Sequence, residues 1–462
     1  MRSRTVARLY PNGLDPETGE YLLPPLDLCG CERIQPALAI RGGPISGVEE
    51  SRLECAGWAV VFAEDASEDV RRALEPLLAL RRGQVGPSER FQLFEGDRAF
   101  RRGESKRAWQ ERIGFGDGPA DPDQLPCHLL LVGDPVAIPF EAQFELGIQR
   151  SVGRLWFDRP CEFRSYAERV VQAEGRTASE RRELALFATA NPRDCATEMA
   201  CEDLMEPLAR SLSQAPLGWQ LRAFTREAAT KERLAALLSG QVPLSLLVTT
   251  SHGLGPGAGR PPGEVGALVC QDWPGPGSGP LEPRQVFTAA DLRATRADLS
   301  GLICYHFGCF SGGLPAEDGF ALPGQARQRL AECPRLASLP QAELAQGALA
   351  VVAHVDRAWG FSFLDARDRR QPQTLRSVIE DLMRGVRVGI AARRFQDKLA
   401  EIQPRLLETL AGSPGTRSEP PESFVVDWLA AMDARGYLVL GDPAARLPGP
   451  GPLRLRGGAV GV

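Results

Sequence analysis

Short apolar runs along the chain alternate with stretches in which apolar residues recur at helical spacing. The runs that we expect to be buried strands lie at 58–63, 128–132, 184–188, 221–224, 244–250, 301–307 and 345–354, and a closing strand begins at Tyr437. Helical spacing predicts helices at 66–82, 165–174, 196–212, 226–238, 289–297, 375–399 and 424–435. Strands that alternate with helices in this way indicate an α/β fold with a doubly wound, mainly parallel sheet flanked by helices.

The same pattern divides the chain into four parts. Residues 1–50 are rich in proline and glycine and are expected to be an N-terminal extension that is draped on the domain or reaches a partner. Residues 51–180 form a first α/β subdomain, residues 181–447 a second one, and residues 448–462 a flexible tail. Within the second subdomain, the glycine- and proline-rich stretch at 254–283 predicts an irregular loop, mobile until a substrate or partner orders it.

Two chemically reactive side chains stand at the ends of predicted strands. The run at 244–250 ends in Ser251-His252-Gly253, and the run at 301–307 ends in Gly308 and Cys309. The loops at the carboxyl ends of strands in a parallel α/β sheet share one crevice, so the imidazole and the thiol are expected to meet there.

A thiolate attacks carbonyl carbon, and a neighbouring imidazole can take a proton and return it to a leaving amine. His252 and Cys309 therefore suit nucleophilic catalysis. The plainer alternative is a loop histidine and a small buried cysteine, since free cysteines are usually core residues. Cys304 and His306 lie inside the predicted strand, where packing is the expected role.

The arrangement of these segments resembles the caspase-like clan of cysteine peptidases, with the gingipain-like and CHAT families the most similar. Besides the His-Gly and Cys strand ends, four further stretches carry the resemblance: 128–139 with its "GD…IP" turn, the "GR" strand at 152–155, the strand at 347–353 followed by Trp359, and the terminal "GDP" signature at 437–444. The resemblance covers roughly residues 50–447. It implies a caspase-like fold and the activity of a cysteine endopeptidase, in which the first subdomain contributes to the substrate pocket.

The resemblance also implies roles for individual positions. The backbone N–H groups of Cys309 and Gly253 would hold the oxyanion of the tetrahedral intermediate. An acidic residue at either Glu141 or Glu145 would line the pocket for the residue before the scissile bond, with Trp359 as its wall, and would favour Arg or Lys. Solvated surface glutamates are the plain alternative.

Two further side chains are candidates on their position alone. Asp134, in the turn after the strand at 128–132, is a candidate for the carboxylate that orients His252, and an Asp that only shapes a Gly-Asp-Pro turn is the alternative. His354 ends the strand at 345–354, close enough to the pocket for contact with substrate, although a core histidine is equally expected there.

Composition limits the remaining functions. Of 462 residues, 24% are charged, and the net charge of −5 gives no electrostatic reason to expect nucleic acid. The 11 cysteines are scattered without zinc-site spacing, so neither a metal nor another cofactor is expected. No secretory signal or membrane span is evident, which predicts a cytoplasmic protein without a membrane partner.

The sequence therefore predicts a cytosolic caspase-like cysteine endopeptidase that cleaves a protein or peptide substrate. A regulated bacterial defence or cell-death effector, switched on by an activating partner protein, is one version of this function. The alternative from another class is a catalytically silent, CHAT-like scaffold that binds partner proteins.

Overall fold

The structure is a computed structural model of the chain. It describes residues 8–9, 13–21, 26–27, 43–116, 118–175, 182–215, 217–257, 262–365, 367, 369–411 and 421–447. The predicted tail at 448–462 lies outside these residues, as does most of 1–42. No helix of the described part is long and apolar enough to cross a membrane.

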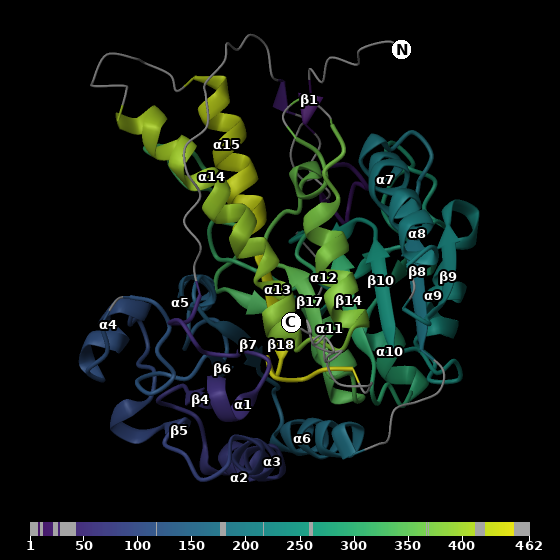
Figure 1. Cartoon of the computed structure of the whole chain (residues 1–462). Helices are drawn as coiled ribbons and strands as arrows, with labels where there is room; N and C mark the ends of the chain where they lie inside the picture. Colours follow the sequence, from purple (N-terminus) through teal and green to yellow (C-terminus); the bar gives the residue numbers. More distant parts are fainter. Residues whose placement is uncertain are drawn as a thin grey trace, which may run out of the picture.

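A sheet of ten strands forms the centre of the fold, in the order β5-β4-β6-β7-β18-β17-β14-β10-β8-β9 (Figure 1). Their bounds are β4 Trp58–Phe62, β5 Phe91–Phe94, β6 His128–Val132, β7 Ser151–Leu155, β8 Glu183–Ala188, β9 Gln220–Thr225, β10 Leu246–Thr250, β14 Ile303–Phe307, β17 Ala350–His354 and β18 Tyr437–Gly441. The expected α/β fold with a mainly parallel sheet is confirmed.

The sheet consists of two halves of parallel strands, one on each side of β18. Strands β5, β4, β6 and β7 are parallel to one another, and so are β17, β14, β10, β8 and β9. The halves meet where β18 pairs with β17 in the antiparallel sense. The last described strand thus joins the two halves. Gly313, after β14, lies against Phe140, after β6, so the carboxyl ends of the two halves meet at one edge of the sheet.

Fifteen α-helices are described, and they flank the sheet. They are α1 Leu53–Ala56, α2 Glu68–Ala73, α3 Glu75–Val85, α4 Lys106–Arg112, α5 Phe140–Gly147, α6 Pro160–Gly175, α7 Cys195–Met199, α8 Glu206–Ser213, α9 Lys231–Leu237, α10 Ala289–Thr295, α11 Ser338–Ala345, α12 Gln373–Met383, α13 Val388–Ala392, α14 Arg394–Ala411 and α15 Glu422–Arg435. A π-helical turn, η2 (Ala200–Met205), joins α7 to α8. The long pair α14 and α15 rises from one edge of the sheet (Figure 1).

Burial on both faces explains why the strands are continuous apolar runs. In β4, Trp58 and Val60 pack into the large core cluster with α2, α3 and α6, whereas Ala59 and Val61 pack into a second cluster with α4 and α5. Alternate side chains of one strand therefore enter two different cores, and neither set can be polar.

Two helix predictions were wrong in their extent. The predicted helix at 375–399 is divided into α12, α13 and α14, because Gly385 has a φ of 79° and ends α12. The predicted helix at 66–82 is divided at Leu74 into α2 and α3, and α3 has a proline in its first turn. In both places the apolar spacing continues across the break, which is why spacing alone misses it.

The stretch predicted to be an irregular loop at 254–283 is largely folded in its described part. Strands β11 (Gly253–Leu254), β12 (Leu268–Val269) and β13 (Val286–Phe287) pair with β2 (Gly13–Leu14) in a small sheet of order β13-β12-β11-β2. Its own apolar core includes Leu14, Leu254, Val269, Trp273 and Leu281. The prediction failed because it weighed the glycines and prolines and not the apolar residues between them.

A buried group of charges ties β18 to the first half of the sheet. The Arg81 guanidinium, fully buried, donates to Asp442 Oδ2 at 2.6 Å and to both carboxylate oxygens of Glu174, at 2.6 and 2.8 Å. Trp58 Nε1 donates to the other oxygen of Asp442 at 2.9 Å. Asp442 belongs to the "GDP" signature, so this signature holds the last strand in place.

Replacing Asp442 by alanine is expected to lower the free energy of unfolding by about 3–5 kcal/mol, because it leaves the Arg81 charge buried beside a single carboxylate. The midpoint of urea unfolding measures the loss. Glu111→Ala, which removes an exposed partner of Arg107, is the control and should leave the midpoint nearly unchanged. Equal midpoints for the two variants would contradict a structural role for Asp442.

Candidate active site

The structure places His252 and Cys309 at the ends of neighbouring parallel strands. β10 pairs with β14 over the full length of both, and the Ser251 N–H then donates to the Phe307 carbonyl at 3.2 Å. The backbones stay in contact beyond the strands, since a Cβ added to Gly253 would lie 1.9 Å from the Cys309 carbonyl oxygen. Only glycine fits at position 253.

The His252 ring is held from one side. Its Nε2 lies 2.7 Å from Asp194 Oδ2, and the rings of Tyr21 and Trp273 pack edge-on against it, with centroids 5.8 and 5.7 Å away. Nδ1 is buried and has no hydrogen-bond partner among the described residues. Because a carboxylate accepts a hydrogen bond, the ring proton is assigned to Nε2, and the lone pair is left on Nδ1.

Asp194 is fully buried and receives hydrogen bonds on both oxygens. The Thr197 hydroxyl donates to Oδ2 at 2.6 Å and the Tyr21 hydroxyl donates to Oδ1. Burial by itself would raise the pKa of the Asp194 carboxyl, but the charge of His252 and these hydrogen bonds outweigh it and lower the pKa from 3.8 to about 2. The site therefore contains a permanent anion behind the imidazole.

Asp194, and not Asp134, is the carboxylate that contacts His252. Asp134 Oδ1 accepts the N–H groups of Val136 and Ala137 at 2.9 and 2.7 Å, so the side chain shapes its own turn. The turn follows β6, which four strands separate from β10 in the sheet, whereas Asp194 follows β8, the parallel neighbour of β10. In the sequence, Asp194 could have been noticed because it lies in the polar turn after the strand at 184–188. That strand ends at the same edge of the sheet as the strand before His252.

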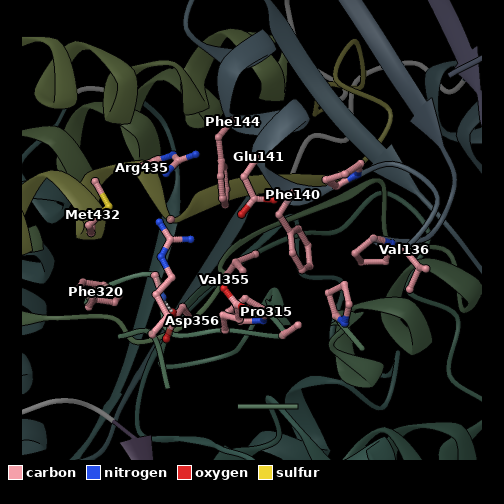
Figure 2. Close-up of a pocket in the computed structure, with 18 residues that line it drawn as sticks. Val136, Phe140, Glu141, Phe144, Pro315, Phe320, Val355, Asp356, Met432 and Arg435 are labelled. Carbon is pink, nitrogen blue, oxygen red and sulfur yellow. Dashed lines mark hydrogen bonds between the residues drawn. The ribbon is translucent and has the colours of Figure 1, made fainter. Parts of the chain in front are cut away.

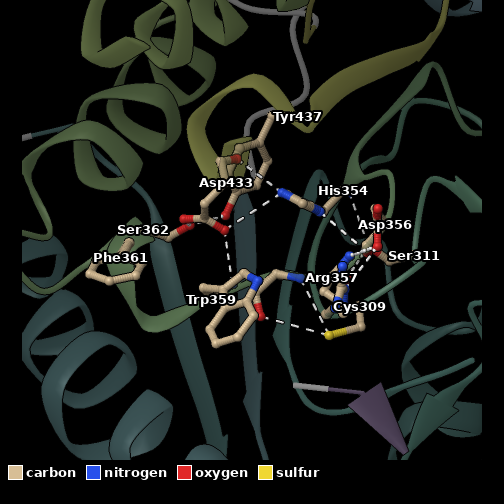
Figure 3. Close-up of polar contacts among 12 residues, drawn as sticks. Cys309, Ser311, His354, Asp356, Arg357, Trp359, Phe361, Ser362, Asp433 and Tyr437 are labelled. Atoms are coloured by element: carbon tan, nitrogen blue, oxygen red, sulfur yellow. Dashed lines mark hydrogen bonds and ion pairs between the residues drawn. The ribbon is translucent and has the colours of Figure 1, made fainter. Parts of the chain in front are cut away.

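The Cys309 thiol lies beneath the segment that follows β17. Its sulfur accepts the Ala358 N–H at 3.3 Å, and it has no exposed surface (Figure 3). Burial raises the pKa of the Cys309 thiol, against a smaller opposing effect of the Ala358 hydrogen bond. The adjoining residues Phe310 and Asp356 both have left-handed φ angles, 56° and 69°, and the Phe310 N–H donates to the Asp356 carbonyl at 2.6 Å. Residues with such strained backbone angles are often found at functional sites.

Two residues expected to touch substrate are core residues in the structure. His354 is fully buried, with Nε2 2.9 Å from the Asp433 carbonyl and its ring edge-on to Tyr437. The Trp359 N–H donates to Asp433 Oδ1 at 2.8 Å, and its side chain packs against Phe320 in the core formed with α14 and α15 (Figure 3). Asp433 thus fixes both residues, and neither lines a cavity described here.

A cavity of about 330 Å³ lies beside the loops that carry Cys309 (Figure 2). Apolar side chains line it, among them Phe140, Phe144, Phe320, Val355 and Met432, together with the charged residues Glu141, Glu317, Asp356, Arg327 and Arg435. Glu141 thus lies at the cavity, whereas Glu145 is not one of its lining residues. Phe320 lines the cavity and packs against Trp359, which is not one of the lining residues.

Beneath the thiol, Cys304, His306 and Glu343 form a buried cluster whose potential ligand atoms lie within 4.8 Å of one another. Among the described residues this is the group that could hold a metal ion. Hydrogen bonds already satisfy the imidazole, because Nδ1 lies 2.8 Å from Thr249 Oγ1 and Nε2 lies 3.0 Å from both oxygens of Glu343. The cluster packs β14 against α11, which agrees with the packing role expected for Cys304 and His306.

No family model and no curated protein sequence matches the chain. Similar solved structures include the Arg-specific cysteine proteinase gingipain R (RgpB), at 14% identity over 87% of this chain and 80% of that one, with a TM-score of 0.44. A complex of Porphyromonas gingivalis RgpB pro- and mature domains matches at 13% identity over 85% of this chain and 79% of that one, with a TM-score of 0.45.

The separase–securin complex of Saccharomyces cerevisiae matches at 13% identity over 69% of this chain and 16% of that one, with a TM-score of 0.32. The chain is similar in fold to caspase-like cysteine peptidases. This similarity is one of fold alone.

The lowered pKa of Asp194 predicts how stability depends on pH. An anion with a folded-state pKa of about 2 stabilises the fold above pH 3.8, and that stabilisation is lost as the pH falls toward 2. The full effect is about 2 kcal/mol, of which about half is lost by about pH 3. Urea unfolding of the wild type and of Asp194→Asn at about pH 5 and about pH 3 should show the larger acid loss in the wild type. Parallel losses in the two proteins would rule the effect out.

Proposed function

We propose that the chain is a cysteine endopeptidase in which Cys309 is the nucleophile and His252 the acid and base. The observation that carries the proposal is the orientation of the His252 imidazole. Its Nε2 donates to the buried Asp194 carboxylate, and its Nδ1 has no partner among the described residues. The backbone of the next residue, Gly253, touches that of Cys309. His354 and His306 use both ring nitrogens, whereas the buried His128 also leaves Nδ1 without a partner but has a backbone carbonyl, and not a carboxylate, at Nε2.

The reaction follows from these roles. His252 Nδ1 takes the thiol proton as the Cys309 sulfur bonds to the scissile carbonyl carbon, and the oxyanion is held by the backbone N–H groups of Cys309 and Gly253. The C–N bond then breaks and His252 returns the proton to the leaving amine. Water, deprotonated by His252, adds to the thioester, the C–S bond breaks and the acid product leaves with the thiol restored.

Asp194 would act through His252 and not on the substrate. By accepting from Nε2, its carboxylate keeps the proton on that nitrogen and the lone pair on Nδ1, and it stabilises the imidazolium that forms when the thiol loses its proton. Thr197 in turn fixes the carboxylate. This makes Asp194 a positioning residue.

A specific observation favours the second candidate, a silent scaffold that binds partner proteins. Cys309 has no exposed surface and its burial raises the thiol pKa, both of which are typical of a structural cysteine. A thiol-directed peptide probe separates the two candidates: an endopeptidase becomes labelled at Cys309 during turnover, whereas a scaffold stays unlabelled there.

Replacement of Cys309 or of His252 by alanine is expected to lower peptidase turnover by about 10³-fold or more, because nucleophile and base act as a unit. Asp194→Asn should lower kcat by about a hundredfold or more, since the ring is no longer held in one tautomer. Asp134→Asn and Cys304→Ala are the controls and should keep most of the activity. Fluorogenic peptide hydrolysis measures all five variants, and turnover by Cys309→Ala would refute the assignment.

We further propose that the cavity beside Cys309 receives the side chain of the residue before the scissile bond. Val355 and Asp356 of its lining belong to the segment whose Ala358 contacts the thiol, so the cavity and the sulfur share one loop. Glu141 contributes negative charge that would favour Arg or Lys, beside Glu317 and Asp356 of the same lining. Arg327 and Arg435 also line the cavity and would favour an acidic side chain instead.

A peptide library decides between these charges. We expect cleavage after Arg, and less after Lys, and we expect Glu141→Gln to reduce the preference for Arg by about a hundredfold while Glu145→Gln leaves it intact. A preference for Asp or Glu that Arg435→Gln abolishes would overturn the assignment of Glu141 and leave the roles of Cys309 and His252 untouched.

A further inference from the structure

Part of the N-terminal segment lies directly on the candidate site. Strand β2 pairs in parallel with β11, with Gly13 opposite Gly253 and Leu14 opposite Leu254, and the Gly255 N–H donates to the Leu14 carbonyl at 3.3 Å. In a parallel ladder the paired residues use backbone N–H and C=O groups that point toward the neighbouring strand. β2 therefore covers the backbone edge of Gly253, the residue whose N–H the proposed reaction needs.

The segment is clasped by the insertion between β10 and β14. Leu14 is fully buried in the core that contains Trp273 and Leu281. Gly19, at a φ of 70°, lies so close to the insertion that an added Cβ would be 2.5 Å from the Gly279 carbonyl oxygen. A Cβ on Gly257 would likewise be 2.3 Å from the Pro16 ring. Both sides of the contact thus depend on glycine for close approach.

Tyr21, at the end of the same segment, reaches Asp194 and His252. Its hydroxyl donates to Asp194 Oδ1, and its ring stands edge-on against the His252 ring at a centroid distance of 5.8 Å. His252 and Cys309 have no exposed surface in this arrangement.

We propose that residues 13–21 are an inhibitory clasp, a pseudo-ligand of the site that must leave before a substrate binds. The inference rests on the proposed function, because it names the regulation of the same site. A scissile carbonyl that bonds to Cys309 has to place its oxygen at Gly253, and that edge is occupied by β2. The clasp holds on through a strand of two residues, one buried leucine and one tyrosine hydroxyl, a contact small enough to open locally while the sheet stays folded.

The first test removes residues 1–27 and follows alkylation of Cys309 by iodoacetamide, with peptide mass spectrometry to separate it from the other cysteines. We expect labelling of Cys309 to become at least about tenfold faster than in the full chain. A synthetic peptide of residues 8–27, added back, should restore the slow rate. Unchanged or slower labelling after truncation would overturn the clasp.

The second test keeps the chain whole, in case the truncated protein does not fold. Tyr21→Phe removes the hydroxyl that binds Asp194 and keeps the ring, and it should speed labelling of Cys309 by about tenfold, the effect expected for one hydrogen bond to a carboxylate. Glu20→Gln, an exposed neighbour in the same segment, is the matched control and should leave the rate unchanged. Equal rates for Tyr21→Phe and Glu20→Gln would also overturn the clasp.

The labelling rate reports access to the thiol and does not depend on peptidase turnover, so the two proposals fail separately. A truncated protein that labels fast and cleaves no peptide in the library keeps the clasp and refutes the peptidase. A full-length protein that cleaves peptides as fast as the truncated one keeps the peptidase and refutes the clasp.

Discussion

The approach of two backbones at the ends of β10 and β14 sets the geometry of everything around the thiol. The Cys309 carbonyl lies where a side chain at position 253 would be, so the chain that leaves β10 and the chain that leaves β14 touch without any intervening atom. His252 and Cys309 are neighbours for that reason alone. Every other group at the site, from the Asp194 carboxylate to the Ala358 N–H, is arranged around this contact.

The electrostatics of the site are uneven. On the imidazole side a buried anion is stabilised by three donors, from His252, Thr197 and Tyr21. On the thiol side burial favours the neutral form of Cys309. The described state therefore combines a buried carboxylate beside the His252 ring with a Cys309 thiol that burial keeps neutral.

Much of the fold follows from the sequence because the strands are buried on both faces and so form unbroken apolar runs, as in β4, β10 and β14. His252 and Cys309 could be found because each directly follows such a run. Asp194 could not, because its relation to His252 depends on β8 lying beside β10, and no local pattern states which strands pair. The same missing knowledge made Asp134 attractive, since only the strand order shows that four strands separate β6 from β10.

The antiparallel junction between the two halves has a consequence for the order of assembly. One neighbour of β7 in the sheet, β6, is also close to it in the sequence. The other neighbour is β18, which is synthesised after every other described strand. Until then the inner edges of β7 and β17 both expose unpaired backbone groups, the kind of edge that pairs with other chains. The two halves can each form early, and their union waits for one late segment, so folding of this sheet is governed by contacts of long sequence separation and is expected to be slow.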